Sequence, residues 1–353
     1  MRTIAGPEHR RRRCGQSWQC AAAGRTFWFF AVSGLALALG ACGGGGGGAG
    51  IASTPPPPPT PTPRPTPTPT PTPGAGAASV TIFKSPAPGT YATVGTSHAE
   101  GNLYSSPNAR FGTLSTADAD QPHIRYTSAG YYEIQFPSTN WDGLVHYKAI
   151  VNPNSLNTTF EPATTNGPYL AIERAQDSGY LYSELASWGA NTSRSGWMAF
   201  GVPTPPGWVP AAGSASYQGL VHGSADIMEV DALAAGYFPS DVDGSVNLAF
   251  NFGQGTLAGA MSLYLPDGMQ PLALGTYAFK DTVFSVGSTN YSGKFDTTAS
   301  GQNFFLGRFT GPNAEETIGT WALPFVFTTS GQTITADGQT HQAFGAWIAK
   351  KGP

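Results

Sequence analysis

From Ser79 onward, the sequence is divided into short runs in which apolar and polar residues alternate, with turn residues between the runs. Alternation with a period of two places the apolar side chains on one face of a β-strand. The segment Tyr131–Phe136 alternates in this way and is followed by Pro137, a residue that cannot donate to a strand ladder. Because no long amphipathic helical pattern interrupts these runs, we expect an all-β fold.

The most regular part of this pattern, residues 210–353, predicts a barrel. Turn signals such as Pro266-Asp267-Gly268 separate the runs. Eight or nine short strands in about 140 residues favour a closed antiparallel β-barrel, which we expect to have eight strands and no aggregation-prone edge. The expected strands are Ala215–Val221, Val246–Phe252, Thr256–Leu263, Thr276–Phe279, Val283–Val286, Asn290–Phe295, Asn303–Thr310, Thr317–Phe327 and Ala343–Ala349.

Two further features bear on this architecture. Glycines inside the expected strands predict sharp bends at barrel corners; they are Gly219, Gly259, Gly293, Gly307 and Gly319. Residues 79–209 are less regular and rich in Tyr, Ser, Asn and Trp, so we expect a β-rich, handle-like subdomain there. The boundary is expected at the rigid, turn-rich segment Pro203-Thr204-Pro205-Pro206.

The N-terminus has the pattern of an export signal. A cluster of arginines, Arg10 to Arg13, precedes an uncharged, mostly apolar run of 13 residues, Phe27–Leu39. This run is too short to span a bilayer comfortably, which takes roughly 20 residues, and suits a signal peptide. Leu39-Gly40-Ala41-Cys42 follows and matches the lipobox of bacterial lipoproteins. We therefore expect residues 1–41 to be removed and Cys42 to be lipidated; an ordinary signal or a membrane anchor is the alternative.

Residues 42–78 have the composition of a disordered tether. Six glycines, Gly43 to Gly48, are followed by a Pro/Thr repeat from Pro55 to Pro73. Such a segment has too little apolar surface to pack and adopts extended polyproline II, with a reach of about 60 Å. We expect it to hold the folded part away from the membrane.

Charge and cysteine content exclude several classes of function. Residues 1–41 hold six of the 18 basic and one of the 21 acidic residues, which leaves 12 and 20 and a formal charge of about −8. An acidic chain without a Lys/Arg cluster is a poor nucleic-acid binder. The three cysteines, Cys14, Cys20 and Cys42, precede the folded part, so a disulfide framework or thiolate zinc site is not expected there.

The barrel region also resembles a known family. Phe309-Thr310-Gly311-Pro312-Asn313-Ala314-Glu315-Glu316, followed by Gly319-Thr320-Trp321, resembles the most recognisable motif of the transferrin-binding protein B family of surface lipoproteins. Weaker resemblances, in the same order as in that family, are Phe200–Pro205, Gly213–Gly219, Asn251–Gly259 and Phe344–Ala346. The family usually has Asp at the position of Asn251. Residues 79–179 resemble its handle only loosely.

The resemblance implies a handle and a barrel on a tether at the outer membrane, displayed at the cell surface, with the periplasmic face as the alternative. Family members capture host iron proteins, haem carriers or complement regulators, and some are translocated to the surface by a dedicated outer-membrane translocon. Transferrin binders have two handle–barrel lobes and this chain has one, which puts transferrin itself in doubt. The motif residues Gly311, Pro312, Asn313, Ala314, Glu316 and Gly319 are expected to be structural.

No residue pattern indicates catalysis. Glu315 and Glu316 are adjacent and follow a turn, so we expect them to accept backbone N–H groups. Asp241-Val242-Asp243-Gly244 lacks the later ligands of a calcium loop, and we interpret it as a hairpin turn. The histidines after residue 42 form no HExxH motif or close pair, although one could ligate haem iron if a loop presents it; they are His98, His123, His146, His222 and His341.

Binding is the activity that the composition favours. Aromatic residues among Ser and Asn make adaptable recognition surfaces. The candidate ligand contacts are Tyr180, Tyr182, Trp188 and Trp208, with packing between the subdomains as the alternative. We expect a cofactor-free, non-enzymatic lipoprotein that binds a protein or nutrient ligand for uptake with an outer-membrane receptor. The alternative is a structural or adhesion lipoprotein.

Overall fold

The computed structural model describes residues 86–352, except 100–109, 152–156, 163–166, 174–177, 191–193, 228–239, 267–270 and 332–334. All of these belong to one compact unit, Pro73–Pro353. The expected signal peptide, Cys42 and the tether lie outside the described residues. In the part that is described, no helix is long and apolar enough to cross a membrane.

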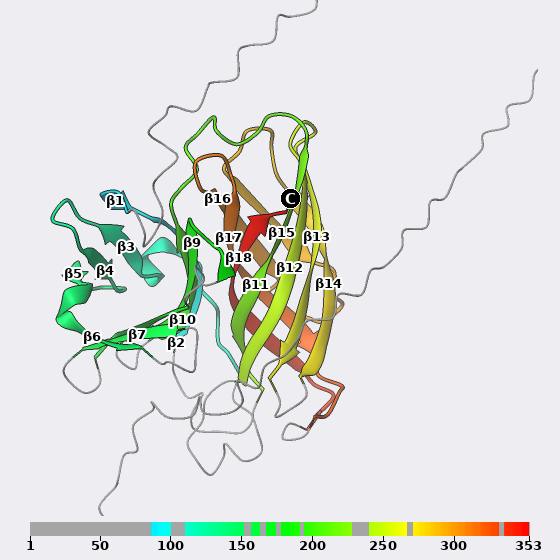
Figure 1. Ribbon diagram of the computed structural model, residues 1–353. Coiled ribbons are helices and arrows are strands. Elements are labelled where there is room, and N and C mark those ends of the chain that lie inside the picture. Colours follow the sequence, from blue (N-terminus) through cyan, green and yellow to red (C-terminus); the bar gives the residue numbers. More distant parts are fainter. Residues whose placement is uncertain are drawn as a thin grey trace, which may run out of the picture. The chain divides into compact units, whose positions relative to one another are not determined.

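The fold is all-β, as predicted, with two single-turn 3₁₀ helices among the described residues (Asp118–Asp120 and Leu144–His146). The second half forms a closed antiparallel barrel of eight strands in sequential order, drawn from green to red in Figure 1, in which β18 returns to pair with β11. Its strands are β11 (Ser214–Ala225), β12 (Ser240–Asn251), β13 (Thr256–Leu265), β14 (Leu272–Val283), β15 (Asn290–Phe295), β16 (Phe304–Thr310), β17 (Glu316–Val326) and β18 (Thr340–Lys351).

One of the nine expected strands, Val283–Val286, is not a separate strand. Thr276–Phe279 lies inside β14, whereas Val283–Val286 begins at the last residue of β14 and continues into the following turn. The pairing of β14 with β15 shifts between Lys280 and Val283, and Asp281 between them has a φ of 48°. This bulge interrupts the alternation within β14, which is why the sequence pattern looked like two strands.

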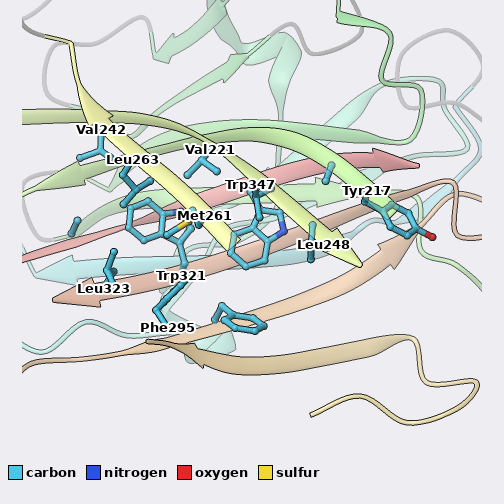
Figure 2. Packing of buried hydrophobic residues seen from close by; sticks show 14 of the residues in the cluster. Tyr217, Val221, Val242, Leu248, Met261, Leu263, Phe295, Trp321, Leu323 and Trp347 are labelled. Atoms are coloured by element: carbon cyan, nitrogen blue, oxygen red, sulfur yellow. The ribbon is translucent and has the colours of Figure 1, made fainter. Parts of the chain in front are cut away.

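The barrel interior is filled with side chains. Residues that point inward from all eight strands form one apolar cluster, part of which Figure 2 shows between the strands. Trp321 and Trp347 are both fully buried there. Phe305 and Phe295 lie beside each other with ring centroids 5.5 Å apart. An eight-stranded barrel is just wide enough for its own side chains, and this one uses its interior as a core.

The glycines inside the barrel strands make room for aromatic rings. A Cβ atom on Gly307 would overlap the ring of Tyr291, which faces it from β15. A Cβ on Gly319 would overlap the indole of Trp347 on β18. Neither glycine has a positive φ. The structural requirement at these two positions is therefore close packing, rather than the corner bend that the sequence suggested.

The first half contains two open antiparallel sheets, which we call the handle. Their facing sides share a second apolar core that includes Ile134, Leu170 and Trp188. One sheet has the order β1-β3-β4-β5 and consists of β1 (Gly89–Thr90), β3 (His123–Tyr126), β4 (Tyr132–Gln135) and β5 (Asp142–Gly143). The other has the order β2-β10-β9-β8-β7-β6 and consists of β2 (Ala92–Ala99), β10 (Arg194–Gly201), β9 (Ser183–Ala190), β8 (Tyr169–Glu173), β7 (Asn157–Pro162) and β6 (Tyr147–Val151).

The proline-rich segment between β10 and β11 is fastened to the barrel. Pro203 forms a bridge with Thr310, and the Thr204 amide donates to the carbonyl of Phe309 at 3.2 Å. The Thr204 hydroxyl donates to the carbonyl of Gly311 at 2.7 Å. The chain thus enters the barrel along β16 and the turn that follows it.

Candidate functional site

Handle and barrel are joined by a third apolar cluster, which we call the seam. Because the seam covers the outer faces of β17 and β18, both faces of these strands are buried, and every residue from Glu316 to Phe325 is inaccessible. The handle contributes Ala92, Phe111, Leu114, Tyr180, Leu185, Trp197 and Ala199, and the barrel contributes Ile318, Ala322, Phe344, Ala346 and Ile348. A seam built from both parts fixes their relative position.

Glu316 is the buried carboxylate of the seam. It accepts the backbone N–H groups of Leu181 at 2.7 Å and Tyr182 at 3.1 Å. Burial raises the pKa of its carboxyl, although these donors and Ser183 act in the opposite direction. Ser183 also shares a hydrogen bond of 2.7 Å with Thr310 of β16. The Glu316 side chain thus holds the start of β9 against the barrel.

Glu315 serves the turn that precedes β17. It accepts the backbone N–H of Asn313 at 2.7 Å and the side-chain amide of the same residue at 2.9 Å. Gly311 and Ala314 adopt φ values of 84° and 55° in this turn. The Tyr217 hydroxyl donates to the Ala314 carbonyl at 2.6 Å. The two glutamates therefore have separate backbone partners and do not form a carboxylate pair.

The four candidate ligand contacts differ in how deeply they are buried. Trp188 is fully buried in the handle core, Tyr180 is 4% exposed in the seam, and Tyr182 is 8% exposed with its ring beside Gly311. The Tyr180 hydroxyl donates to the carbonyl of Ile348 at 3.3 Å. For these three residues the structure favours the packing alternative, because their side chains do not reach the surface. Trp208 is partly exposed and remains a candidate.

His98 lies at the seam in its neutral form. Its ring nitrogens lie 3.0 Å from the Ala99 carbonyl and 3.0 Å from the Ser195 hydroxyl. Its ring lies against Phe111 and Phe344, with centroids 4.9 Å and 5.4 Å away. Burial lowers the pKa of His98 and outweighs the hydrogen bond to Ala99. An imidazole in this position packs as an apolar group at neutral pH.

His222 pairs with a residue that the sequence assigned to a turn. Asp243 was expected in a hairpin turn, but it lies inside β12, directly opposite His222 of β11, and their side chains are 2.9 Å apart. Trp197 stacks on His222, with centroids 5.9 Å apart. Burial acts to lower the pKa of His222, but Asp243 outweighs it, so the pKa is raised. The turn prediction was wrong because Val242, which is fully buried, is the one apolar residue between Asp241 and Gly244 and did not mark a strand by itself.

His341 lies between two carboxylates at the opposite end of the barrel from Glu315. Its Nδ1 is 3.1 Å from Asp226, and its Nε2 is 3.1 Å from both oxygens of Asp337. Burial acts to lower the pKa of His341, but the two carboxylates outweigh it and raise the pKa. Arg110 approaches Asp337 at 3.6 Å. The sequence did not indicate this array, because Asp226 and His341 are 115 positions apart.

These arrangements suit structure and recognition more than chemistry. Among the described residues, no group of three or more His, Cys, Asp and Glu side chains could hold a metal ion. Around His341 the carboxylates face opposite ring edges, so the three side chains do not converge on one point. His123 and His146 lie near Asp118 and Asp142 in the handle.

Comparisons with known proteins identify similar structures but no family model. Neither the family models nor the curated proteins searched include a match to this chain. Among solved structures, a mutant of transferrin-binding protein B from Haemophilus parasuis aligns with 13% identity and a TM-score of 0.38, over 73% of this chain. This chain spans only 44% of the length of that protein.

Two further similar structures are of HpuA from Kingella denitrificans. The apo haemoglobin receptor aligns with 12% identity and a TM-score of 0.38, over 78% of this chain and 90% of that one. The complex of HpuA with human haemoglobin aligns with 12% identity and a TM-score of 0.36, over 66% and 83% of the respective chains.

Proposed function

We propose that this chain is an outer-membrane lipoprotein, anchored by lipid on Cys42, that binds a protein ligand at the cell surface and assists its capture or uptake. The observation that supports a protein ligand most directly is the filled barrel. Trp321 and Trp347 are fully buried inside it, among the side chains of the barrel core. Eight-stranded carriers such as lipocalins keep that space for one small ligand.

A ligand of this chain therefore binds on the outer surface, where a macromolecule makes a larger interface than a small nutrient does. The barrel end that carries the turns after β12, β14 and β16 offers apolar side chains for this purpose. Val286, in the turn after β14, is 50% exposed. Trp208 lies in the segment before β11, where buried Val209 anchors the loop in the barrel core. Exposed aromatic and apolar side chains commonly anchor protein interfaces.

The proposal assigns no catalytic residue and no cofactor. Three titratable groups that could have suggested chemistry already have partners: Glu316 accepts backbone amides, and His222 and His341 are paired with aspartates. The membrane partner is supported by the sequence of the lipobox, and the receptor or translocon by the motif resemblance. The alternative, a structural or adhesion lipoprotein, shares the anchor and differs in having no uptake partner.

Binding of the full chain to immobilised haemoglobin and transferrin tests the proposal, since these are the proteins named for similar structures. We expect one of them to bind, and Trp208→Ala to weaken binding about tenfold or more, as loss of an interface anchor does. Tyr264→Ala is the matched control, because Tyr264 is an exposed aromatic near the other end of the barrel, 37% accessible. It should bind as the unmodified chain does.

Co-purification with outer-membrane receptors from the native cell separates uptake from adhesion. Recovery of a receptor or translocon with the full chain supports uptake. If neither probe protein binds and no transport component is recovered, the uptake proposal fails and the adhesion alternative stands.

A further inference from the structure

A short segment of the handle crosses the barrel end that carries His341. We call residues 110–114 the strap. The Phe111 amide donates to Asp226 at 3.2 Å, and the Leu114 amide donates to the side chain of Gln302 at 2.6 Å. Gln302 returns a hydrogen bond to the Leu114 carbonyl at 3.1 Å. The strap is thus held by side chains of the barrel at both of its ends.

The strap covers part of the seam. Phe111 is 9% exposed, and its ring lies 4.9 Å from His98 and 4.9 Å from Phe344, centroid to centroid. Leu114 belongs to the same apolar cluster. Lifting the strap would therefore expose an apolar surface that is otherwise buried.

The barrel side chains that hold the strap form one connected network. Asp226 accepts the Gln342 amide at 2.9 Å in addition to that of Phe111. Gln342 and Gln302 exchange hydrogen bonds of 3.0 Å and 2.9 Å, so both anchor points of the strap are linked through them. His341 fixes Asp226 from the other side. The orientation of Asp226 thus depends on His341.

We propose that His341, in its protonated form, latches the strap to the barrel end, and that loss of its proton as the pH rises releases the strap. The geometry requires the proton. Each ring nitrogen of His341 faces a carboxylate, and a carboxylate only accepts hydrogen bonds. A neutral imidazole donates from one nitrogen, so its other lone pair would face a carboxylate in a site that buries the ring.

In the described part of the chain, the charged groups that face His341 come from three elements. Asp226 directly follows β11, Asp337 lies in the loop before β18, and Arg110 belongs to the strap itself. With His341 protonated, two positive and two negative charges balance. Loss of the proton leaves one negative charge in excess next to the strap. His98 faces Phe111 from β2 and is neutral in the same range, so it does not oppose the effect.

Amide hydrogen exchange of Phe111 and Leu114 in the full chain measures release of the strap. After correction for the intrinsic exchange rate, we expect their protection to fall about tenfold or more as the pH rises from about 6.5, the ordinary histidine value, through the raised pKa of His341. His341→Gln should give low protection at every pH. His146→Gln, a change at a histidine whose side chain is 68% exposed, is the control and should keep the profile of the unmodified chain.

Asp337→Asn provides a second, independent test. Its side chain is 41% exposed, so the change should leave the barrel folded while it removes one partner of His341. The midpoint of strap release should move to lower pH. Constant protection in the unmodified chain, or its full pH profile retained in His341→Gln, would overturn the latch. If His341→Gln fails to fold, as judged by exchange of β12 amides, an unchanged midpoint in Asp337→Asn overturns it.

Discussion

The carboxylate of Glu316, at the start of β17, accepts the backbone N–H of Leu181 at 2.7 Å, although the two residues are 135 positions apart. The same carboxylate accepts the next amide, that of Tyr182. A side chain of a barrel strand thereby accepts the hydrogen bonds of two handle amides just before β9 begins. This contact ties the stability of the two parts together.

Replacement of Glu316 should destabilise the whole described unit. Glu316→Ala leaves two amides without an acceptor, one of them at a buried residue, and we expect a loss of about 2–4 kcal/mol in the free energy of unfolding. Glu315→Gln should cost less than about 1 kcal/mol, because its partners lie in an exposed turn. Urea denaturation followed by tryptophan fluorescence gives both values. Equal losses in the two variants would contradict the role assigned to Glu316.

Acid should weaken the seam through His98. Because burial lowers the pKa of His98 in the folded chain, the unfolded chain takes up the proton more readily. This residue contributes stability that is present above about pH 6.5 and is lost as the pH falls through its folded pKa. Denaturation midpoints of the unmodified chain and His98→Gln between about pH 7 and pH 5 should converge as the acidity increases. A constant difference would show that His98 does not titrate in this range.

Close packing at Gly307 predicts a large effect from one methyl group. In Gly307→Ala the new Cβ overlaps the ring of Tyr291, whose hydroxyl is itself held by Thr317 at 2.7 Å. We expect a loss of about 1–3 kcal/mol, the usual cost of overpacking a core. Gly253→Ala, where the nearest atoms stand at an ordinary 3.7 Å, serves as the control. Similar thermal midpoints for the two variants would argue against the ring-over-glycine packing.

Lipidation of Cys42 predicts a change of location without a change of fold. Cys42→Ala should move the protein from the membrane fraction to the soluble fraction, because two or more acyl chains are needed for stable attachment. Fractionation after a high-salt wash, with circular dichroism of the released protein, checks both parts. Retention in the membrane would point to Phe27–Leu39 as the anchor.

Much of the barrel could be predicted from the sequence, because a strand with one face on a core has apolar and polar residues in alternation. The bounds expected for Asn290–Phe295 match β15. The bulge at Asp281 hid the continuity of β14, since a register shift moves later side chains to the other face. In β17 the sequence Trp321-Ala322-Leu323-Pro324-Phe325 has no alternation, which is typical of a strand buried on both faces. That signal marks where the handle docks.

The long-range side-chain pairs of the barrel were harder to predict from the sequence. His222 and Asp243 meet because β11 and β12 are in a particular register, and register depends on the whole barrel. His341 and Asp337 are four residues apart, but the second carboxylate, Asp226, comes from the other end of the barrel sequence. For the aromatic candidates the difficulty was different, because the residues were identified but their role was not. Tyr180 and Trp188 looked suited to recognition, but large rings serve equally well as core, and burial decides between the two.

The pairing of β11 with β18 has a consequence for the order of events during synthesis. The first barrel strand cannot acquire one of its two neighbours until the last one has been made. The handle also cannot complete its packing before then, because the apolar faces that it packs against belong to β17 and β18. Contacts so distant along the chain form slowly. We therefore expect the growing chain to keep an unclosed barrel until its final strand has been made.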